Sequence, residues 1–408
     1  MVVLGGSRAH WGGLESFCTR ATEAVTAAQT RWTATWETTD TAYLKPRQLP
    51  RAARRLSALP RLAREGVDLV WLQWSAMADL AYVWQARALG LPVMVTPHLG
   101  ANARLQRVPA LSRACAALLT GADRLALLFD GQEAEIALPR HVPRSLLRTF
   151  LPPASLVAPL LERHGTTLRL VHAGRLSEGK GTFRTVALCA ALRDRGIDVS
   201  ARIIGRADPQ TAAALRVAID AAALGQSIEL IEWVDEHDLI RFLGEADVLA
   251  HLSTLDSFPL IVLEAMAMGV VAVVGEMAGA RSMVRWHGGY VAQDSSAEDA
   301  AAWIAGQSPD ALRAQGRAAA LSVRAAYDWR SCAEQVMVAP HFEEYALRLS
   351  VALAAHAEVL LVIDTGVLAT EFAERDMPSH PRLRLSHSSF ATPAELVRLL
   401  AELRRFRP

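Results

Sequence analysis

The sequence predicts an α/β protein with two doubly wound parallel-sheet domains, because three features occur together. Short apolar segments alternate with helical segments over residues 1–335. The chain has 408 residues, which is enough for two sizeable hydrophobic cores. A break at TFLPP, Thr149 to Pro153, divides the alternation into two series. Buried strands joined by helical crossovers form parallel sheets, so we expect one such sheet in each series.

The first series, residues 1–152, is predicted to form the amino-terminal domain. It opens on MVVLGG, a strand that leads into a glycine-containing loop, and residues 16–28 have helical character. Further buried strands are predicted at VDLVWLQW (67–74), LPVMVTPH (91–98) and RLALLF (124–129). Residues 153–165 are expected to form a loose linker to the second domain.

The second series, residues 166–335, is predicted to form the carboxyl-terminal domain. A helix is expected from Thr182, ended by Gly196. The predicted strands are LRLVHAG (168–174), VSARIIG (199–205), SIELIEWV (227–234), ADVLAHLS (246–253) and VVAVVGE (270–276). Ligands of doubly wound domains usually bind outside the carboxyl ends of the strands, so the sequence predicts a ligand site in a cleft between the two domains.

The tail, residues 336–408, is predicted to be an α/β extension. VMVAP, AEVLLVID and RLRLSHSS are strand-like, and the helical FEEYALRLSVALA lies between the first two. This order resembles the start of a β-α-β unit. An appended extension and the truncated beginning of a second, similar domain are both open interpretations.

Composition argues against several other classes of protein. Hydrophobic residues make up 51% of the chain and the net charge is +1, which argues against disorder and against a polyanion-binding protein. The four cysteines show no C-x-x-C pair and are expected to be buried thiols in a reducing compartment. No secretory signal precedes the first strand, and no apolar run reaches the roughly 18 residues of a membrane span. We therefore expect a soluble, cytoplasmic protein that binds no nucleic acid.

The segment HAGRLSEGKG, His172 to Gly181, is a candidate anion site. Arg175 and Lys180 lie in the loop after a predicted strand, where side chains face the expected cleft. An arginine can donate to two phosphate oxygens and a lysine to a third. Lys180 is one of only two lysines, the other being Lys45, so its ammonium group is retained against a strong preference for arginine. The alternative is a solvated loop with two surface cations.

The segment DSFPLIVLEAMAMG raises the question why Glu264 lies inside an apolar helical run. An unpaired buried carboxylate costs several kcal/mol, so a polar partner is expected. Asp256 and Ser257 are good N-cap residues, Pro259 suits the first helical turn, and Gly269 is expected to end the helix. Glu264 would then lie one turn beyond the anion-accepting helix start and could bind a diol such as ribose. The alternative is a buried glutamate paired with an arginine.

A glycine pair, Gly12 and Gly13 in GGSRAHWGGLESF, follows the first strand and precedes a helix. Glycines at this place permit a positive φ and allow backbone N–H groups to approach an anion. A plain tight turn is the alternative interpretation.

Together these motifs resemble those of retaining glycosyltransferases of family 4, the glycosyl transferases group 1. The motifs are Gly12-Gly13, Gly174-Arg175-Leu176 with Lys180-Gly181, and Asp256-x7-Glu264 followed by Ala265-Met266-Ala267-x-Gly269. The resemblance covers about residues 1–335. It implies the GT-B fold, in which two Rossmann-like domains hold a nucleotide sugar between them.

The resemblance also implies a role for each matching residue. The implied donor-binding residues are Gly12, Gly13, Arg175, Lys180, Ser257, Phe258, Pro259, Leu260 and Glu264. Arg175 and Lys180 would bind the diphosphate, and Glu264 would bind the ribose. The implied catalytic residues are Asp256, near the reacting centre, and His98, which looks like the family's histidine that contacts the donor sugar.

Three positions depart from the family pattern. Asp256 is one methylene shorter than the usual glutamate, Ser257 replaces a glycine, and Ser282 stands where many relatives carry a glutamate. No D-x-D triplet occurs, so we expect metal-independent catalysis without a cofactor, in which Arg175, Lys180 and helix N-termini neutralise the diphosphate. The resemblance implies front-face displacement with retention at the anomeric carbon.

The implied function is transfer of a sugar from a nucleotide-diphosphate sugar to a saccharide or lipid-linked acceptor in bacterial polysaccharide or glycolipid biosynthesis. One alternative is a non-catalytic GT-B protein with a degenerate sugar-nucleotide site. Another is a sugar-nucleotide 2-epimerase, which would not explain the Asp256-x7-Glu264 pair.

A basic segment, Lys45 to Gly66, has seven cations and one acid, with leucines between them. One interpretation is a surface that contacts anionic lipid at the inner membrane, which would suit a lipid-linked acceptor. The other is an ordinary solvated pair of arginine-rich helices, interrupted by Pro50 and Pro60.

Overall fold

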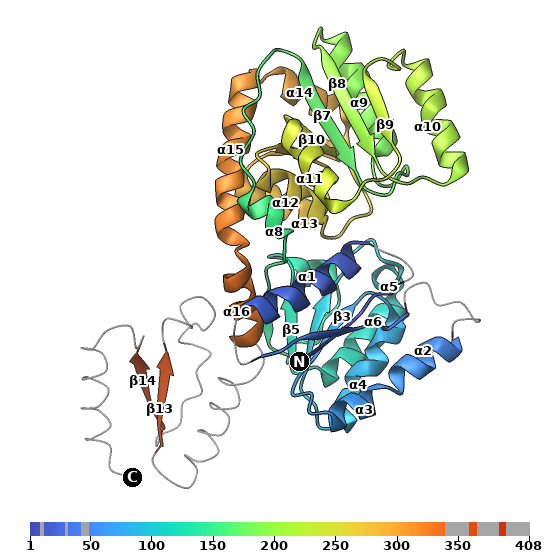
Figure 1. The fold of residues 1–408 in the computed structure, drawn as a ribbon. Coiled ribbons are helices and arrows are strands. Elements are labelled where there is room, and N and C mark those ends of the chain that lie inside the picture. The colour runs from blue at the N-terminus through green and yellow to red at the C-terminus, as the bar shows by residue number, and fades with distance from the viewer. Residues whose placement is uncertain (9–11, 29–31, 42–48, 339–358, 365–382, 389–408) are drawn as a thin grey trace. The chain divides into compact units, whose positions relative to one another are not determined.

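The computed structural model describes residues 1–8, 12–28, 32–41, 49–338, 359–364 and 383–388. The chain divides into two units, Met1–Ala333 and Glu334–Pro408. The first unit holds two six-stranded sheets, each covered by helices (Figure 1). Every strand pairing within them is parallel, so the predicted α/β class is confirmed.

The amino-terminal sheet has the strand order β2-β1-β3-β4-β5-β6. Its strands are β1 (Val2–Leu4), β2 (Thr35–Glu37), β3 (Val70–Trp74), β4 (Val93–Pro97), β5 (Arg124–Leu127) and β6 (Arg144–Leu146). All five residues of β3 and of β4 are buried, as expected for strands covered by helices on both faces. The edge strands β2 and β6 were not predicted, because TWE and RSL contain no apolar run.

The helices of this domain include two that correct a prediction. The full set is α1 (Gly13–Ala27), α2 (Leu49–Leu56), α3 (Leu59–Arg64), η2 (Met77–Leu80), α4 (Ala81–Ala88), α5 (Arg104–Arg107), α6 (Pro109–Leu118), η3 (Leu119–Gly121) and α7 (Gln132–Glu135). Pro50 and Pro60 were expected to interrupt helices, but each lies in the first turn of one. The first turn tolerates proline because its N–H groups have no intrahelical partner.

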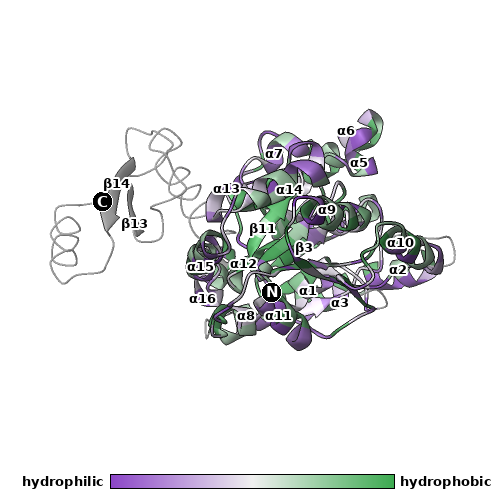
Figure 2. Ribbon diagram, turned by 90° about the horizontal axis from the view of Figure 1, so that it is seen from above, coloured by the Kyte–Doolittle hydropathy of each residue, from purple (hydrophilic) through white to green (hydrophobic). Residues whose placement is uncertain are grey.

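The carboxyl-terminal sheet has the order β12-β11-β10-β7-β8-β9. Its strands are β7 (Leu168–Ala173), β8 (Val199–Ile204), β9 (Ile228–Ile231), β10 (Val248–His251), β11 (Val271–Val274) and β12 (Tyr290–Val291). Strands β10 and β11 are buried throughout, and Figure 2 shows β11 among the hydrophobic elements. The five predicted strands of this domain are confirmed within a few residues, and the two-residue β12 was not predicted.

Helices cover both faces of this sheet and return to the first domain. They are α8 (Pro153–Val157), α9 (Thr182–Asp194), α10 (Pro209–Ala221), α11 (Glu236–Glu245), α12 (Leu260–Ala267), α13 (Ala278–His287), η4 (Gln293–Ser295), α14 (Ala297–Ala305), α15 (Pro309–Ala326) and α16 (Trp329–Val338). Trp329 Nε1 donates a hydrogen bond of 2.6 Å to the carbonyl of Leu151. Arg148 donates to the carbonyl of Ala326 at 2.8 Å. The chain is therefore tied to its amino-terminal domain a second time.

The linker, residues 153–165, is more ordered than the expected loose segment. It begins with helix α8 and contains the buried Arg163. Arg163 donates to the carbonyls of Gly244 at 3.0 Å and Gly269 at 2.6 Å, and lies 3.3 Å from Asp247 Oδ1. These contacts fix the linker against the second domain.

The tail is described only in part, and by itself. Val336–Val338 ends helix α16, so VMVAP does not begin a strand as predicted. The predicted strands AEVLLVID and RLRLSHSS contain β13 (Val359–Asp364) and β14 (Leu383–Ser388), which pair in parallel. The helical FEEYALRLSVALA lies outside the described residues. A parallel pair fits both interpretations of the tail, and they stay open.

Candidate functional site

The loop between β7 and α9 carries the predicted anion-binding residues. Gly174 and Gly181 at its two ends have φ angles of 144° and 83°, which a side chain would strain. A Cβ on Gly181 would also lie 2.5 Å from the carbonyl of Leu252, so glycine is required where this loop passes the end of β10. Lys180 is thereby held just before the amino end of α9, beside the chain that leaves β10. Arg175 is exposed.

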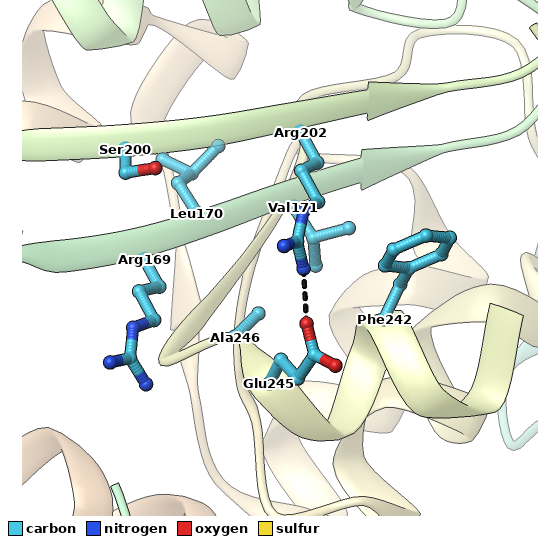
Figure 3. A pocket seen from close by; sticks show the side chains of 8 residues that line it. All are labelled: Arg169, Leu170, Val171, Ser200, Arg202, Phe242, Glu245 and Ala246. Carbon is cyan, nitrogen blue, oxygen red and sulfur yellow. Dashed lines mark hydrogen bonds and ion pairs between the residues drawn. The ribbon is translucent and has the colours of Figure 1, made fainter. Parts of the chain in front are cut away.

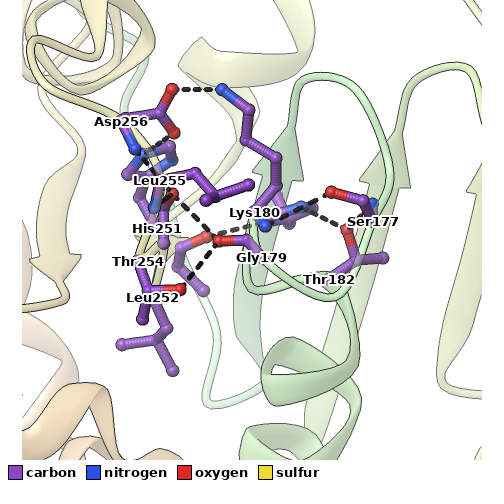
Figure 4. Close-up of polar contacts among 12 residues, drawn as sticks. Ser177, Gly179, Lys180, Thr182, His251, Leu252, Thr254, Leu255 and Asp256 are labelled. Atoms are coloured by element: carbon purple, nitrogen blue, oxygen red, sulfur yellow. Dashed lines mark hydrogen bonds and ion pairs between the residues drawn. The ribbon is translucent and has the colours of Figure 1, made fainter. Parts of the chain in front are cut away.

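Asp256 lies at the centre of a polar cluster after β10 (Figure 4). Lys180 Nζ contacts its Oδ1, and Nε2 of His251 lies 3.0 Å from its Oδ2. Burial by itself raises the pKa of Asp256, but His251 and Lys180 outweigh burial and hold the pKa far below its usual range. Asp256 is therefore an ionised carboxylate whose Oδ1 contacts Lys180 and whose Oδ2 faces the ring of His251.

The predicted cap of the following helix is wrong. Helix α12 begins at Leu260, its N-cap residue is Pro259, and no side chain caps it. Asp256 does not cap the helix because Lys180 and His251 engage its carboxylate instead. Gly269 does end the helix as predicted, with a φ of 78° directly after the C-cap Met268. The first N–H groups of α12 have no intrahelical partner, as at any helix start.

Residues on both sides of Asp256 contact the amino-terminal domain. Asn102 donates to the carbonyl of Leu255 at 2.6 Å, and the ring of Phe258 stacks on Phe129 at 6.0 Å. On its other side the segment packs tightly on α13, since a Cβ on Gly279 would lie 1.9 Å from the carbonyl of Ser257. Ser282, also on α13, is half-buried. The loop that carries Asp256 and Ser257 is thus fixed by both domains.

Glu264 has an arginine partner, as the second of the two interpretations expected. Nη1 of Arg20, on α1, lies 2.8 Å from Glu264 Oε1, and each side chain is only 9% exposed. Arg20 also contacts Glu236 on α11 at 2.6 Å and the carbonyl of Phe150 at 3.4 Å. Burial lowers the pKa of Arg20, but the two carboxylates more than offset this effect and raise it. The ribose-binding role of Glu264 stays a prediction.

Arg20 and Glu236 are two of the residues near the predicted site that the sequence analysis did not identify. The buried position of Glu264 did predict a polar partner, and an arginine was one alternative. Nothing in the sequence identifies which arginine, because Arg20 precedes Glu264 by 244 residues and lies in the other domain.

His98 lies directly after β4 and is held on several sides. Its backbone N–H donates to Trp74 at 2.8 Å, its Nε2 lies 2.9 Å from Gln73 Oε1, and its ring meets Phe17 edge-on at 4.9 Å. Burial lowers the pKa of His98 to about 3, so the ring is neutral at physiological pH. Because Oε1 only accepts, Nε2 carries the proton and Nδ1 is left as an acceptor.

The glycine pair differs from its prediction. Gly12 is the N-cap residue of α1 with an extended φ of −157°, and Gly13 is the first helical residue. Among the described residues of this loop, Gly6 has a positive φ, at 65°, and a Cβ there would lie 2.7 Å from Glu15 Oε1. A Cβ on Gly13 would meet nothing within 4 Å. The described residues therefore do not require glycine at position 13.

A cavity of about 380 Å³ lies at the other end of the carboxyl-terminal sheet (Figure 3). It is lined by the early residues of β7 and β8 and by the end of α11, among them Arg169, Arg202 and Glu245. Arg202 is paired there with Glu245 and stacks on Phe242. None of the predicted site residues lines this cavity, so it is separate from the Asp256 cluster.

Comparison with known proteins places these residues in a family. Residues 161–313 match the model of the glycosyl transferases group 1. The chain carries a glycosyl transferases group 1 domain. This domain contains Arg175, Lys180, Asp256 and Glu264.

Two relatives align with part of this chain. Amylovoran biosynthesis glycosyltransferase AmsK of Erwinia amylovora is 30% identical over 142 residues, which are 33% of this chain and 34% of the relative. A GDP-mannose-dependent alpha-(1-6)-phosphatidylinositol dimannoside mannosyltransferase of Mycobacterium tuberculosis is 34% identical over 110 residues, 27% of each chain. The matches thus span about a third or less of these relatives.

Solved structures extend the likeness to both domains. Anabaena Alr3699/HepE, in complex with UDP and glucose, has a TM-score of 0.64 at 15% identity, and the match covers 82% of this chain and 98% of that chain. Sucrose-phosphate synthase of Thermosynechococcus elongatus has a TM-score of 0.66 at 19% identity, with 86% and 99% covered. The two parallel sheets therefore form the GT-B fold that the motifs implied.

Among the described residues, no helix is both long and apolar enough to cross a membrane. A mostly exposed group at the start of α11, Asp235, His237 and Asp238, has the composition of a cation site. Asp235 caps the helix by accepting from the Asp238 N–H at 2.8 Å, which accounts for its position.

Proposed function

We propose that this protein is a retaining, metal-independent glycosyltransferase that moves a sugar from a nucleotide-diphosphate sugar to a hydroxyl of a saccharide or lipid-linked acceptor. One observation carries the proposal: Lys180 and Asp256, 76 residues apart, meet beside the amino ends of two helices within the matched domain. The relatives named for polysaccharide and glycolipid synthesis support the acceptor classes.

In this proposal residues 166–335 bind the donor, residues 1–152 bind the acceptor, and residues 153–165 link the two. Arg175 and Lys180 would bind the diphosphate together with the N–H groups at the starts of α9 and α12. These fixed positive groups stabilise the charge that the leaving diphosphate develops. Gly12 and Gly13, at the amino end of α1, would approach the phosphates from the other domain.

The sugar would lie near Asp256, His98 and the backbone of Phe258 to Leu260. The ionised Asp256 accepts hydrogen bonds only, whereas the neutral His98 ring retains an acceptor nitrogen for a sugar hydroxyl. The acceptor hydroxyl would attack on the face from which the diphosphate leaves, with a phosphate oxygen taking its proton. Catalysis then depends on positioning and charge stabilisation, and needs no nucleophilic side chain.

A second candidate is a sugar-nucleotide-binding protein without turnover. The pairs Lys180–Asp256 and Arg20–Glu264 favour it, because they occupy four polar groups that a donor would use or displace. Transfer of radiolabelled sugar to any acceptor, or slow release of free sugar from a donor, would exclude this candidate.

A further proposal is that the basic segment, Lys45 to Gly66, contacts anionic membrane. Helix α2 buries none of its residues, which suits a peripheral contact surface. However, Arg51 and Arg55 lie 3.0 and 3.3 Å from Asp40, so two of its cations already have a partner. These pairs favour the solvated interpretation. Cosedimentation with phosphatidylglycerol vesicles, absent with phosphatidylcholine vesicles, would support membrane contact instead.

The test of donor binding is a thermal-shift titration with UDP-, GDP-, ADP- and dTDP-sugars. A ligand at 100 times its Kd stabilises the folded state by roughly 2.7 kcal/mol. We expect a full shift with one nucleotide class in the wild-type protein and in Arg184→Ala, and a much smaller shift in Lys180→Ala at the same donor concentration. Arg184 is the matched control because it is a nearby cation that donates to the carbonyls of Glu178 and Leu252, away from Asp256. No shift with any donor would contradict the proposal.

A further inference from the structure

His251 is a buried histidine whose ring nitrogens form no aligned hydrogen bond with the described residues. It is the last residue of β10, in the middle of the sheet between β7 and β11, and is 4% exposed. Its Nε2 lies 3.0 Å from Asp256 Oδ2, but the contact is oblique and the atoms do not form an aligned hydrogen bond. Its Nδ1 has no hydrogen-bond partner among the described residues. Leaving buried polar atoms unsatisfied is costly, so this arrangement calls for an explanation.

The neighbouring His172 shows what a structural histidine looks like at this place. It lies on β7, and both of its ring nitrogens are engaged, by the Ala250 carbonyl at 2.9 Å and by Thr182 Oγ1 at 3.1 Å. Burial lowers the pKa of His172 to about 4, so its ring stays neutral. Among the described residues, the polar group nearest to a ring nitrogen of His251 is the Asp256 carboxylate, and its Nδ1 has no hydrogen-bond partner.

The charges around Asp256 change if Lys180 binds a diphosphate. Lys180 now contacts Asp256 Oδ1 and His251 faces Oδ2. If the Lys180 ammonium group moves toward a diphosphate, it neutralises Asp256 less. The half-buried Asp256 carboxylate is then left close to an anionic ligand. Like charges in a buried site repel strongly, so a second cation beside Asp256 would favour binding.

We propose that His251 is a positioning residue for donor binding, which takes up one proton and becomes the cationic partner of Asp256 when Lys180 turns to the diphosphate. The proton comes from solvent and binds the unprotonated ring nitrogen, and no bond between heavy atoms changes. The inference rests on the proposed function. It explains why the histidine faces Asp256 without an aligned hydrogen bond: the contact would tighten only after Lys180 leaves.

Three ionisable groups act on the His251 ring, and displacement of one of them, Lys180, favours protonation of the ring. They are Asp256 in the following loop, Lys180 in the β7–α9 loop and the neutral His172 on β7. Arg184 on α9 approaches the same turn through the carbonyl of Leu252. Displacing Lys180 removes a positive charge from the surroundings of the ring and exposes it to a negative one, and both changes favour the imidazolium form.

The first test measures proton uptake on binding. UDP-glucose and GDP-mannose contain no group that titrates near neutral pH, so calorimetry at pH 7.5 in buffers of different ionisation enthalpy reports protons taken up by the protein. We expect uptake on the order of one proton in the wild-type protein. His251→Gln retains a hydrogen-bond donor without a titrating ring, so it should still bind, with affinity weaker by about tenfold, and take up fewer protons. Equal uptake in both proteins would overturn the inference.

The second test needs no ligand and separates this inference from the proposed function. The ring of His251 is followed by NMR during a pH titration, with its signal assigned through His251→Gln. Lys180→Met should raise its titration midpoint by about one pH unit, whereas the control Arg184→Met should leave it nearly unchanged. No shift in Lys180→Met would overturn the coupling even if donors bind. A shift without binding of any nucleotide sugar would support the coupling and contradict the proposed function.

Discussion

The two ion-paired carboxylates of the Asp256-x7-Glu264 motif differ in where their partners come from. Asp256 is paired within its own domain, by Lys180 and His251. Glu264 is paired across the domains, by Arg20 of α1. The contacts of Asp256 with Lys180 and His251 all lie within the carboxyl-terminal domain, whereas the Arg20–Glu264 pair exists only while α1 lies against α12. One motif therefore joins a local electrostatic site to a contact between domains.

This difference indicates what each carboxylate contributes. Buried ion pairs add little net stability over apolar packing, yet removing one partner is strongly destabilising. Arg20 and Glu264 are both almost fully buried, so we expect their pair to matter mainly for the specific arrangement of the two domains. Lys180 and Asp256 are more accessible, so we expect their pair to matter mainly for ligand binding.

The largest effect should come from Glu264→Ala, which leaves the buried Arg20 with the exposed Glu236 as its remaining carboxylate partner and a long contact to the Phe150 carbonyl. We expect a loss of about 3 kcal/mol in the free energy of unfolding, measured by urea denaturation. The double variant Arg20→Met/Glu264→Met removes both charges and should recover most of this loss. A loss below about 1 kcal/mol in the single variant would show that Arg20 finds solvent easily and that the pair is not a constraint between domains.

Lys180→Met should change stability little but should weaken donor binding strongly. Asp256 keeps His251 as a partner, so the loss in unfolding free energy should stay below about 1 kcal/mol. Donor affinity, however, should fall by roughly 30-fold, since a charge-assisted contact to the diphosphate is lost. Calorimetric titration with the donor found by thermal shift measures the second quantity, and Arg184→Met is the matched control. A large stability loss with unchanged affinity would reverse the distinction between the two carboxylates.

The sequence predicted the elements of both domains well because buried parallel strands have a local signature. VWLQW and VMVTP are continuous apolar segments, and each forms a strand close to its predicted limits. The short edge strands β2 and β6 lack this signature, and pairing with a neighbouring strand rather than local composition determines them. Positions in the tail that were predicted as strand became helix at 336–338 for a related reason, because VMV alone suits either structure.

The candidate site could be predicted only where its residues lie in recognisable motifs. Lys180, Asp256 and Glu264 were proposed from such motifs, and the structure brings Lys180 and Asp256 together, while their roles stay predictions. Arg20 could not be found, because the contact joins segments 244 residues apart. His251 was missed because it is the last residue of an apolar strand. Nothing in the sequence indicates that the loop after this strand brings Asp256 back to the histidine ring.

The pH dependence of stability also distinguishes the Asp256 cluster, with Lys180 and His251, from the Arg20–Glu264 pair. The pKa of Asp256 is depressed in the folded protein, so this group contributes stability above the ordinary aspartate pKa near 4 and loses it as the pH falls toward the folded value. Asp256→Asn lacks this contribution. We therefore expect the wild-type protein to be more stable than Asp256→Asn at pH 6, and the difference in urea midpoint to shrink between pH 4 and pH 2.5. A difference that is constant over this range would mean that Asp256 is not held ionised by its neighbours.

The smallest effect should come from Glu236→Gln, at the exposed end of the contact between domains. Glu236 is 53% exposed, and Arg20 keeps Glu264, so we expect a loss of about 0.5 kcal/mol that disappears in 1 M salt. Glu229→Gln is the matched control: Glu229 is 62% exposed and shares Arg202 with Glu245, but that cluster lies within one domain. Equal, small losses in the two variants would mean that Glu264 alone anchors Arg20. A loss in Glu236→Gln several times that of the control would mean that α1 is held to α11 and α12 jointly, so that a ligand displacing Arg20 from Glu264 would still leave the domains connected through Glu236.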